Sequence, residues 1–263
     1  MKHVLFVGCS YVAGSGWELE QQDPHLWVNL LHRNTNLKQY SLINHSRGGR
    51  SNAGIFQDAV WNIGRYPIEY AFVSWTAMPR YELSLGLELY ETRAGFMPNG
   101  QCFDWNLNDI RYSKKYLENI RDRFTTLPHL HFEILNLIYY VNALVDIGNR
   151  VGTKIFFVNS MCPWDQNYFT RLHSVLPNQY TKFTQKLINC DNRDDHEIFS
   201  LYDKLHNEYD QAGGIQESHW LNLYNSLVSQ KVDVNSDGAH PGIKSNQLYY
   251  TQLHQALQSL IGS

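Results

Sequence analysis

The sequence has 263 residues, 18% charged and 43% hydrophobic, which is typical of a folded globular protein rather than a disordered chain. Lys and Arg number 22 against 25 Asp and Glu, so the formal charge is −3 and no nucleic-acid-binding surface is indicated. Four scattered cysteines, with no Cys-x-x-Cys pair, indicate neither a zinc site nor a disulfide framework. No apolar run approaches the roughly 18 residues of a membrane helix, and the opening run is too short for a signal peptide. We therefore expect a cytoplasmic protein without a membrane partner.

The first third of the chain alternates apolar runs with helical patterns. Strands are predicted over residues 3–7, 39–43 and 70–75. Asp23-Pro24 predicts the start of a helix that continues over residues 25–33, with Asp23 as its cap. A second helix is predicted from Ser51-Asn52 to the break at Pro67. This order, strand-helix-strand-helix-strand, is typical of a parallel sheet.

The remainder departs from simple alternation before returning to it. Asn99-Gly100 predicts a hairpin within residues 90–105, and helices are expected over 109–124 and 128–150. A fourth strand is predicted over 154–159, several short helices within 165–214, a short fifth strand at 220–223 and a final helix over 243–260. We predict one α/β domain over residues 1–263: a three-layer α/β/α fold with a flavodoxin-like parallel sheet of about five strands. The large insertion after the third strand, residues 78–152, is a candidate lid or specificity region, and its aromatic residues would equally suit an oligomer contact.

Polar residues follow several of these strands at the edge where parallel α/β proteins place their chemistry. Ser10 follows the first strand within Gly8-Cys9-Ser10, and a glycine-bearing turn over residues 44–52 follows the second. Near the end of the chain, Asp237 precedes His240 by three residues. A carboxylate at that spacing can bind one imidazole nitrogen and leave the other free to act as a base.

Together these motifs resemble those of the SGNH (GDSL-like) family of serine esterases and acyl hydrolases. Gly8-Cys9-Ser10 is similar to the family's Gly-Asp-Ser block, residues 44–49 to its second block, residues 74–77 to its third, and residues 237–240 to its last. The resemblance spans nearly the whole chain through short motifs. It implies a three-layer α/β/α fold and no metal or organic cofactor.

The resemblance also implies a role for each matched residue. Ser10 would be the nucleophile, His240 the general base and then acid, and Asp237 its orienting partner. The backbone N–H groups of Ser10 and Gly49 would stabilise the oxyanion.

Two positions depart from the family pattern. Cys9 stands where the family has Asp, which makes a cysteine nucleophile an alternative to Ser10. The third block, normally Gly-x-Asn-Asp, reads Ser-Trp-Thr-Ala, so the Asn donor of the oxyanion hole is missing. The hydroxyl of Thr76 lies at the matching position and can donate a hydrogen bond. The amide of Asn52 is the competing substitute, and the alternative role of Asn52 is to cap the following helix.

These features predict hydrolysis of an O-acetyl or other acyl ester of a carbohydrate or small molecule through an acyl-Ser10 intermediate. Two alternatives remain: a catalytically weak binding domain for glycans or phage assembly, and an acyltransferase using the same serine. The altered first and third blocks also resemble a divergent branch associated with bacteriophages, so a phage-encoded protein is an expectation.

Overall fold

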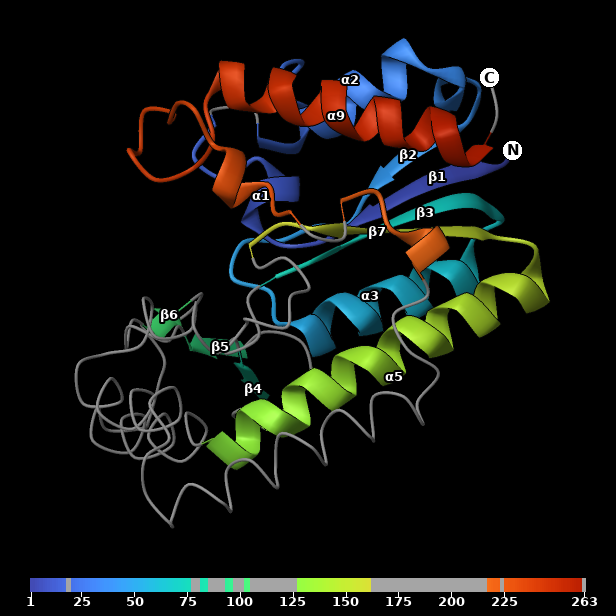
Figure 1. Ribbon diagram of the computed structural model, residues 1–263, viewed down its shortest axis with the longest axis vertical. Helices are drawn as coiled ribbons and strands as arrows, with labels where there is room; N and C mark the ends of the chain where they lie inside the picture. The colour runs from blue at the N-terminus through green and yellow to red at the C-terminus, as the bar shows by residue number, and fades with distance from the viewer. Residues whose placement is uncertain are drawn as a thin grey trace, which may run out of the picture. The chain divides into compact units, whose positions relative to one another are not determined.

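The computed structural model describes residues 1–17, 20–76, 81–84, 93–96, 102–104, 127–161, 217–222 and 225–261 (Figure 1). The chain divides into two compact units. The first consists of Met1–Ala77, Val141–Trp164 and Gln216–Ser263, and the second of Met78–Tyr140 and Asp165–Ile215. The interpretation of the whole chain as one domain with an insertion over residues 78–152 stays a prediction.

A parallel four-stranded sheet with the order β2-β1-β3-β7 forms the centre of the first unit. Its strands are β1 (His3–Val7), β2 (Ser41–Asn44), β3 (Ile68–Trp75) and β7 (Lys154–Asn159). Trp220 adds a single parallel bridge to Phe157, on the far side of β7 from β3. The flavodoxin-like α/β fold predicted from the sequence is thus confirmed, with the fifth strand reduced to one bridge.

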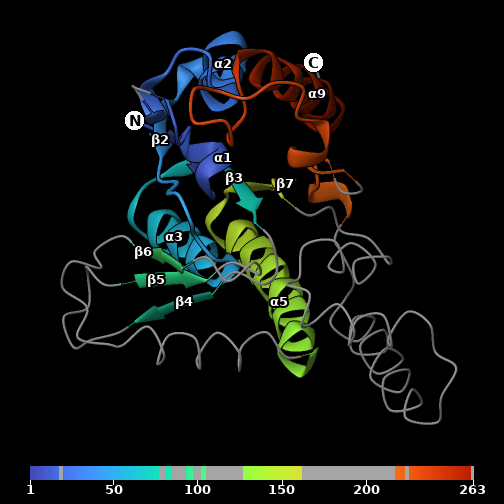
Figure 2. The same cartoon turned by 90° about the vertical axis from the view of Figure 1, so that its left-hand side faces the viewer.

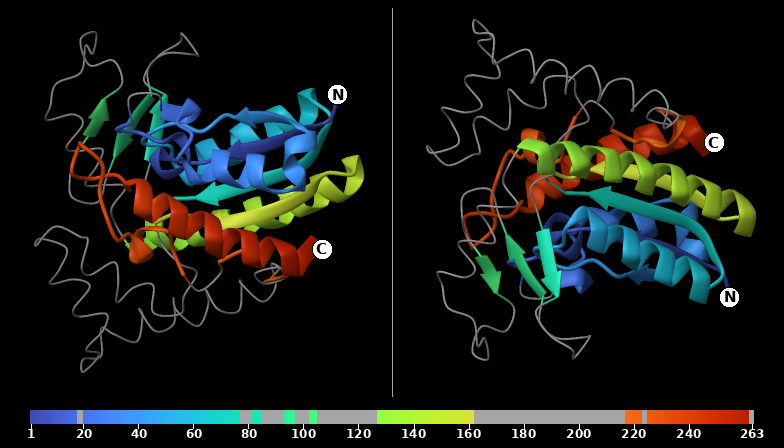
Figure 3. Two further views of the ribbon diagram at one scale, coloured as in Figure 1. Left: turned by 90° about the horizontal axis from the view of Figure 1, so that it is seen from above. Right: turned by 90° about the horizontal axis from the view of Figure 1, so that it is seen from below.

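Helices cover both faces of this sheet. On one face α2 (Trp27–Asn34) and α9 (Ile243–Ile261) lie side by side (Figure 3). On the other lie α3 (Asn52–Arg65) and the part of α5 (Leu127–Val151) that belongs to this unit. The other helical turns described in the first unit are short: α1 (Ser10–Ala13), η1 (Glu20–Gln22), η2 (Asn36–Gln39), η4 (Glu217–His219) and η5 (Val228–Gln230).

The central strand β1 is buried on both faces, as its unbroken apolar sequence requires. Val4 and Phe6 join the core beneath α2 and α9, whereas Leu5 and Val7 alternate to the opposite face. The Phe6 ring stacks on Phe72 of β3, with ring centroids 4.6 Å apart. This packing fixes the strand that leads into Ser10.

The start of α2 differs from the sequence prediction. Asp23 does not cap the helix: its carboxylate accepts a hydrogen bond from the His25 N–H, at 2.8 Å, within a preceding turn. The helix begins at Trp27, whose N–H donates to the side chain of Asn246 on α9, at 3.1 Å. A buried residue more than 200 positions away therefore supplies an acceptor that local sequence cannot reveal.

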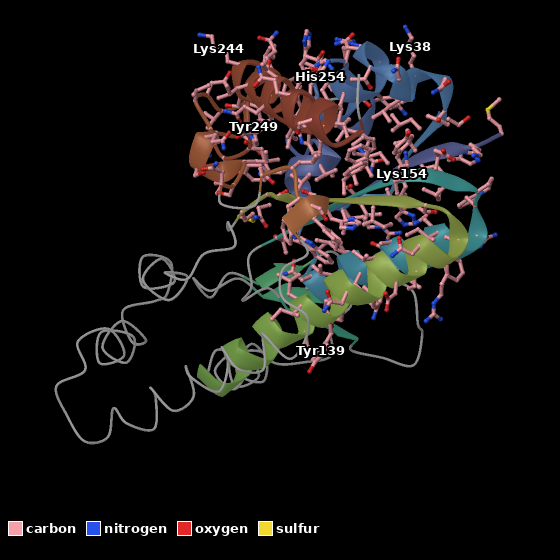
Figure 4. The ribbon with its side chains drawn as sticks, turned by 45° about the vertical axis from the view of Figure 1, so that its right-hand side comes forward. Lys38, Tyr139, Lys154, Lys244, Tyr249 and His254 are labelled. Carbon is pink, nitrogen blue, oxygen red and sulfur yellow. The ribbon has the colours of Figure 1, made fainter. Side chains whose placement is uncertain are left out.

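Helix α9 presents a buried and an exposed face. Tyr249 is fully buried against the core, while Lys244 lies exposed at the start of the helix (Figure 4). Burial raises the pKa of the Tyr249 hydroxyl far above its ordinary value. The tyrosine is thus a neutral packing residue that ties α9 to the sheet.

The second unit contains an antiparallel sheet of three short strands (Figure 2). They are β4 (Tyr81–Ser84), β5 (Arg93–Phe96) and β6 (Cys102–Asp104). The antiparallel pairing of β5 with β6 confirms the hairpin predicted around Asn99-Gly100, and α5 confirms the helix predicted over 128–150. The helices predicted over 109–124 and within 165–214 lie outside the described residues.

Candidate active site

The first catalytic candidate, Ser10, lies in the turn that follows β1. It is the first residue of α1 and retains 6% of its surface exposed, whereas the preceding Cys9 is fully buried in the core. Gly8 permits this turn because a Cβ there would lie 2.5 Å from Val12 Cγ2 and 2.9 Å from Ser74 Cβ. The geometry favours Ser10 over Cys9 as the residue available to a substrate.

The glycine turn after β2 lies beside the Ser10 turn. The N–H groups of His45 and Arg47 donate to the carbonyls of Phe6 and Gly8, at 2.8 and 3.1 Å, which extends the pairing of β1 with β2. Gly49 then adopts a left-handed conformation, with φ 68°. Within the described part of the chain, the backbone N–H groups of Ser10 and Gly49 have no acceptor, so both are available to a ligand oxygen.

Asp237 and His240 form a hydrogen-bonded pair in the turn ahead of α9. His240 Nδ1 lies 2.5 Å from Asp237 Oδ2, while Oδ1 accepts the N–H groups of Ala239 and His240, at 2.8 and 2.9 Å. Burial by itself raises the pKa of Asp237, but the hydrogen bonds from His240 and Ala239 outweigh it and lower that pKa below its ordinary value. The ionised carboxylate selects the Nδ1–H tautomer, and Nε2 is left without a partner among the described residues.

This segment, residues 235–240 and called the histidine turn below, lies against the loop that follows Ser10. Asn235 Nδ2 donates to the Ser15 carbonyl at 3.2 Å, and the Tyr11 and His240 rings meet edge to face with centroids 6.1 Å apart. Gly16, with φ 87°, allows the approach because a Cβ there would lie within 2.3 Å of Asp237 Oδ2. Accordingly, the loop that precedes α9 lies at the same end of the sheet as α1 in two views (Figures 1 and 3).

A second carboxylate holds the histidine turn onto α9. Asp233 accepts the backbone N–H groups of Lys244 and Ser245, at 3.0 and 2.7 Å, and the Ser245 hydroxyl at 2.5 Å. It thereby caps the first turn of α9 from the far side of the histidine turn. This role could not be predicted from local sequence, because Asp233 stands ten residues before the first residue of α9, where no capping pattern exists.

Thr76 and Asn52 meet at the end of β3. Asn52 Oδ1 accepts the Thr76 N–H at 2.9 Å and Asn52 Nδ2 donates to the Thr76 carbonyl at 3.4 Å, so the amide engages the Thr76 backbone on both sides. The Thr76 hydroxyl donates to Met161 Sδ at 3.3 Å, and sulfur is a weak acceptor. Of the two side chains, the Thr76 hydroxyl has the weaker bond to give up to a substrate.

The structure brings most of the predicted residues to the carboxyl edge of one sheet. Ser10, Gly49 and Thr76 follow β1, β2 and β3, and Gly16 and Tyr11 join the Ser10 loop to the histidine turn. Both Ser10 and His240 are described, and no hydrogen bond joins Ser10 Oγ to the His240 ring. Catalytic hydrogen bonds are often long before a substrate binds, so the arrangement is compatible with a triad.

Other kinds of site find no support in the described ranges. No group of three or more His, Cys, Asp or Glu side chains there could hold a metal ion. None of the helices in those ranges combines the length and apolar character needed to cross a membrane.

Comparisons with known proteins give matches at the level of structure only. No protein-family model matches the sequence, and no curated protein matches it significantly. A solved structure of TesA is 13% identical with a TM-score of 0.45, over 99% of this chain and 100% of the other. The esterase EstA from a Pseudoalteromonas species is 14% identical, also with a TM-score of 0.45, over 99% of both chains. A carbohydrate acetylesterase family member from Sinorhizobium meliloti is 13% identical with a TM-score of 0.44, over the whole of both chains.

Proposed function

We propose that this protein is a divergent SGNH-like serine hydrolase that cleaves a carboxylic ester. The observation that carries the proposal is the Asp237–His240 pair, which is held against the Ser10 loop by Tyr11 and Gly16. Among the described residues, this pair leaves His240 Nε2 without a partner. A serine hydroxyl becomes an effective nucleophile only when a neighbouring base takes its proton. We assign this role to His240, whose ring lies against Tyr11, the residue after Ser10.

In the proposed reaction, Ser10 Oγ attacks the ester carbonyl carbon while its proton passes to His240 Nε2. The carbonyl oxygen becomes an oxyanion that accepts hydrogen bonds from the N–H groups of Ser10 and Gly49 and from the Thr76 hydroxyl. The tetrahedral species then expels the alcohol, which takes the proton from Nε2. Water hydrolyses the acyl-Ser10 by the same steps in reverse, and Asp237 stabilises the imidazolium throughout.

The assignment of the third donor to Thr76 follows from what Asn52 already does. Both ends of the Asn52 amide bind the backbone of Thr76, which suits Asn52 to positioning the donor. The Thr76 hydroxyl must leave only a thioether sulfur to reach the oxyanion.

The proposed substrate is an O-acetyl or other acyl ester of a carbohydrate or small molecule, bound without metal or organic cofactor. Transfer of the acyl group to an alcohol other than water would use the same intermediate, and product analysis with an added alcohol acceptor distinguishes the two reactions. The association with bacteriophages stays a prediction.

A labelling experiment tests the nucleophile. A fluorophosphonate probe should modify the wild-type protein and the Ser15→Ala control, since Ser15 is the other serine of the same loop, but not Ser10→Ala. Hydrolysis of p-nitrophenyl acetate should fall by roughly 10³-fold or more in Ser10→Ala. Equal labelling or equal turnover in Ser10→Ala and wild type would refute the role of Ser10.

A second candidate function is ligand binding without turnover. It is favoured by the missing hydrogen bond between Ser10 Oγ and His240 and by the missing Asn of the third block. Glycan-array binding that survives Ser10→Ala, together with no turnover of acetylated glycans by the wild type, would support this alternative.

A further inference from the structure

A buried ion pair follows directly after Gly49. The Arg50 side chain is 1% exposed, and it binds both carboxylate oxygens of Asp58 on α3, Nε to Oδ2 at 2.7 Å and an Nη to Oδ1 at 2.5 Å. Burying a charged pair gives little net stability because the loss of hydration offsets much of the attraction. The bidentate geometry, in contrast, fixes the direction of the guanidinium and of the backbone that carries it.

The two residues after Arg50 are also anchored, each to a different element. Ser51 caps α3, its hydroxyl accepting the Gly54 N–H at 3.1 Å. Asn52 binds the backbone of Thr76 at the end of β3. Three consecutive side chains therefore fix the chain immediately after Gly49 to a helix face, a helix start and a strand end.

The chain before Gly49 is fixed as well. The Arg47 N–H donates to the Gly8 carbonyl at 3.1 Å, and Gln21 Nε2 donates to the Ser46 carbonyl at 2.7 Å. Gly48 lies against Ser15, since a Cβ at Gly48 would be 3.2 Å from Ser15 Oγ. Gly49 itself adopts φ 68°, which glycine does without steric strain, and the chain is held on both sides of it.

We propose that the Arg50–Asp58 pair is a positioning device that aims the Gly49 N–H at the oxyanion. This inference rests on the proposed hydrolase function and deepens it. An oxyanion donor stabilises the transition state only when it is fixed before the reaction, and misplacing a catalytic group by about 1 Å can cost about 10²-fold in rate. Arg50 and Asp58 touch neither substrate nor nucleophile in this scheme, and act only through Gly49.

Asp58→Asn and Arg50→Lys test the proposal, with p-nitrophenyl acetate as substrate and a phenylboronic acid as an analogue of the tetrahedral intermediate. Asn keeps the shape of Asp58 without its charge, and Lys keeps the charge of Arg50 without its bidentate fork. Each variant should lower kcat roughly 10- to 100-fold with KM nearly unchanged, and should weaken boronate binding by a similar factor. The exposed ion pair of Lys2 with Glu69 provides the control, and Lys2→Met should change neither quantity.

The outcomes distinguish failure of the positioning role from failure of the proposed hydrolase function. If the wild type shows no turnover and no Ser10-dependent labelling, the hydrolase function itself fails. If the wild type is active and folded Asp58→Asn or Arg50→Lys retains its kcat and its boronate affinity, the positioning role is overturned. If KM rises as kcat falls, or if neither variant folds, the ion pair has only a structural role. Either result would also overturn the positioning role.

Discussion

The nucleophile side of the candidate site and its histidine turn are held by different kinds of interaction. The nucleophile side, formed by Ser10, Gly49 and Thr76, stands at the ends of β1, β2 and β3, with Ser10 6% and Thr76 2% exposed. The histidine turn is exposed at Asp237, and carboxylates accepting backbone N–H groups shape it. Packing should therefore control the first region, whereas charge and turn geometry should control the second.

After Ser10→Ala, Thr76→Val gives the largest effect expected on the nucleophile side. Valine keeps the shape of threonine but cannot donate, so kcat for ester hydrolysis should fall about 10²-fold, a barrier increase of roughly 2.7 kcal/mol, with little change in stability. Thr153→Val is the matched control: its buried hydroxyl donates to the Ile68 carbonyl at 2.7 Å, at the opposite end of β3. That variant should lose stability and keep its kcat. An unchanged rate in Thr76→Val would transfer the donor role to Asn52 or to the backbone.

Gly8→Ala tests the packing that supports Ser10. The new methyl group would overlap Val12 and Ser74, so the free energy of unfolding should fall by about 2 kcal/mol in urea titrations. Gly64→Ala on α3 meets nothing within 4 Å and should instead raise it by roughly 0.5 to 1 kcal/mol, because alanine favours a helix. Equal effects at the two glycines would contradict the tight approach of β1 to β3 at Ser74.

Most of the fold could be predicted because it follows from patterns within short windows of sequence. The β7 run was predicted with its observed bounds, and α3 begins at the predicted Ser51-Asn52. The suggestion that Asn52 caps this helix was wrong, because Ser51 is the cap and Asn52 is the first helical residue. The predicted start of α2 was wrong, because the acceptor for the N–H of its first residue, Trp27, is Asn246, near the other end of the chain. Local windows carry no information on such a partner.

The site shows the same division. Ser10, Gly49 and the Asp237–His240 pair lie within short motifs, so the sequence alone could propose them, and their catalytic roles stay predictions. Asp58 and Asp233 could not be identified from the sequence, because it does not show which donors the fold brings to a carboxylate. These donors are the Arg50 guanidinium for Asp58 and the backbone N–H groups of Lys244 and Ser245 for Asp233. Gly16 is similar: its importance depends on Asp237 being beside it.

Gly16→Ala tests the contact between the two regions. A Cβ at this position would overlap the Asp237 carboxylate and must also tolerate φ 87°. Displacement of Asp237 should lower kcat about 10-fold, a barrier increase of roughly 1.4 kcal/mol. Gly152→Ala carries similar backbone strain, with φ 76° and nothing within 4 Å, so it should lose stability without losing kcat. If both variants retain full kcat, Gly16 does not set the position of the histidine turn.

Asp233→Asn gives the smallest effect, and it acts where the histidine turn meets α9. Burial alone would raise the pKa of Asp233, but the bonds from Ser245 and Lys244 outweigh it and lower that pKa below the ordinary 3.8. A carboxylate whose pKa is lowered on folding stabilises the protein fully above its unfolded-state pKa, and this contribution is lost as pH falls through the folded-state value.

At neutral pH, Asp233→Asn should therefore lower the free energy of unfolding by about 1 kcal/mol. Both carboxylate oxygens accept backbone N–H groups, whereas the amide of Asn has only one accepting oxygen. The difference from wild type should shrink as the pH falls below roughly 4, because protonated Asp233 then resembles the amide. Urea titrations at a series of pH values measure this, with Asp146→Asn, an exposed position on α5, as the control for removing a surface carboxylate. A difference that stays constant down to the lowest pH would mean that the carboxylate charge of Asp233 does not hold the histidine turn to α9.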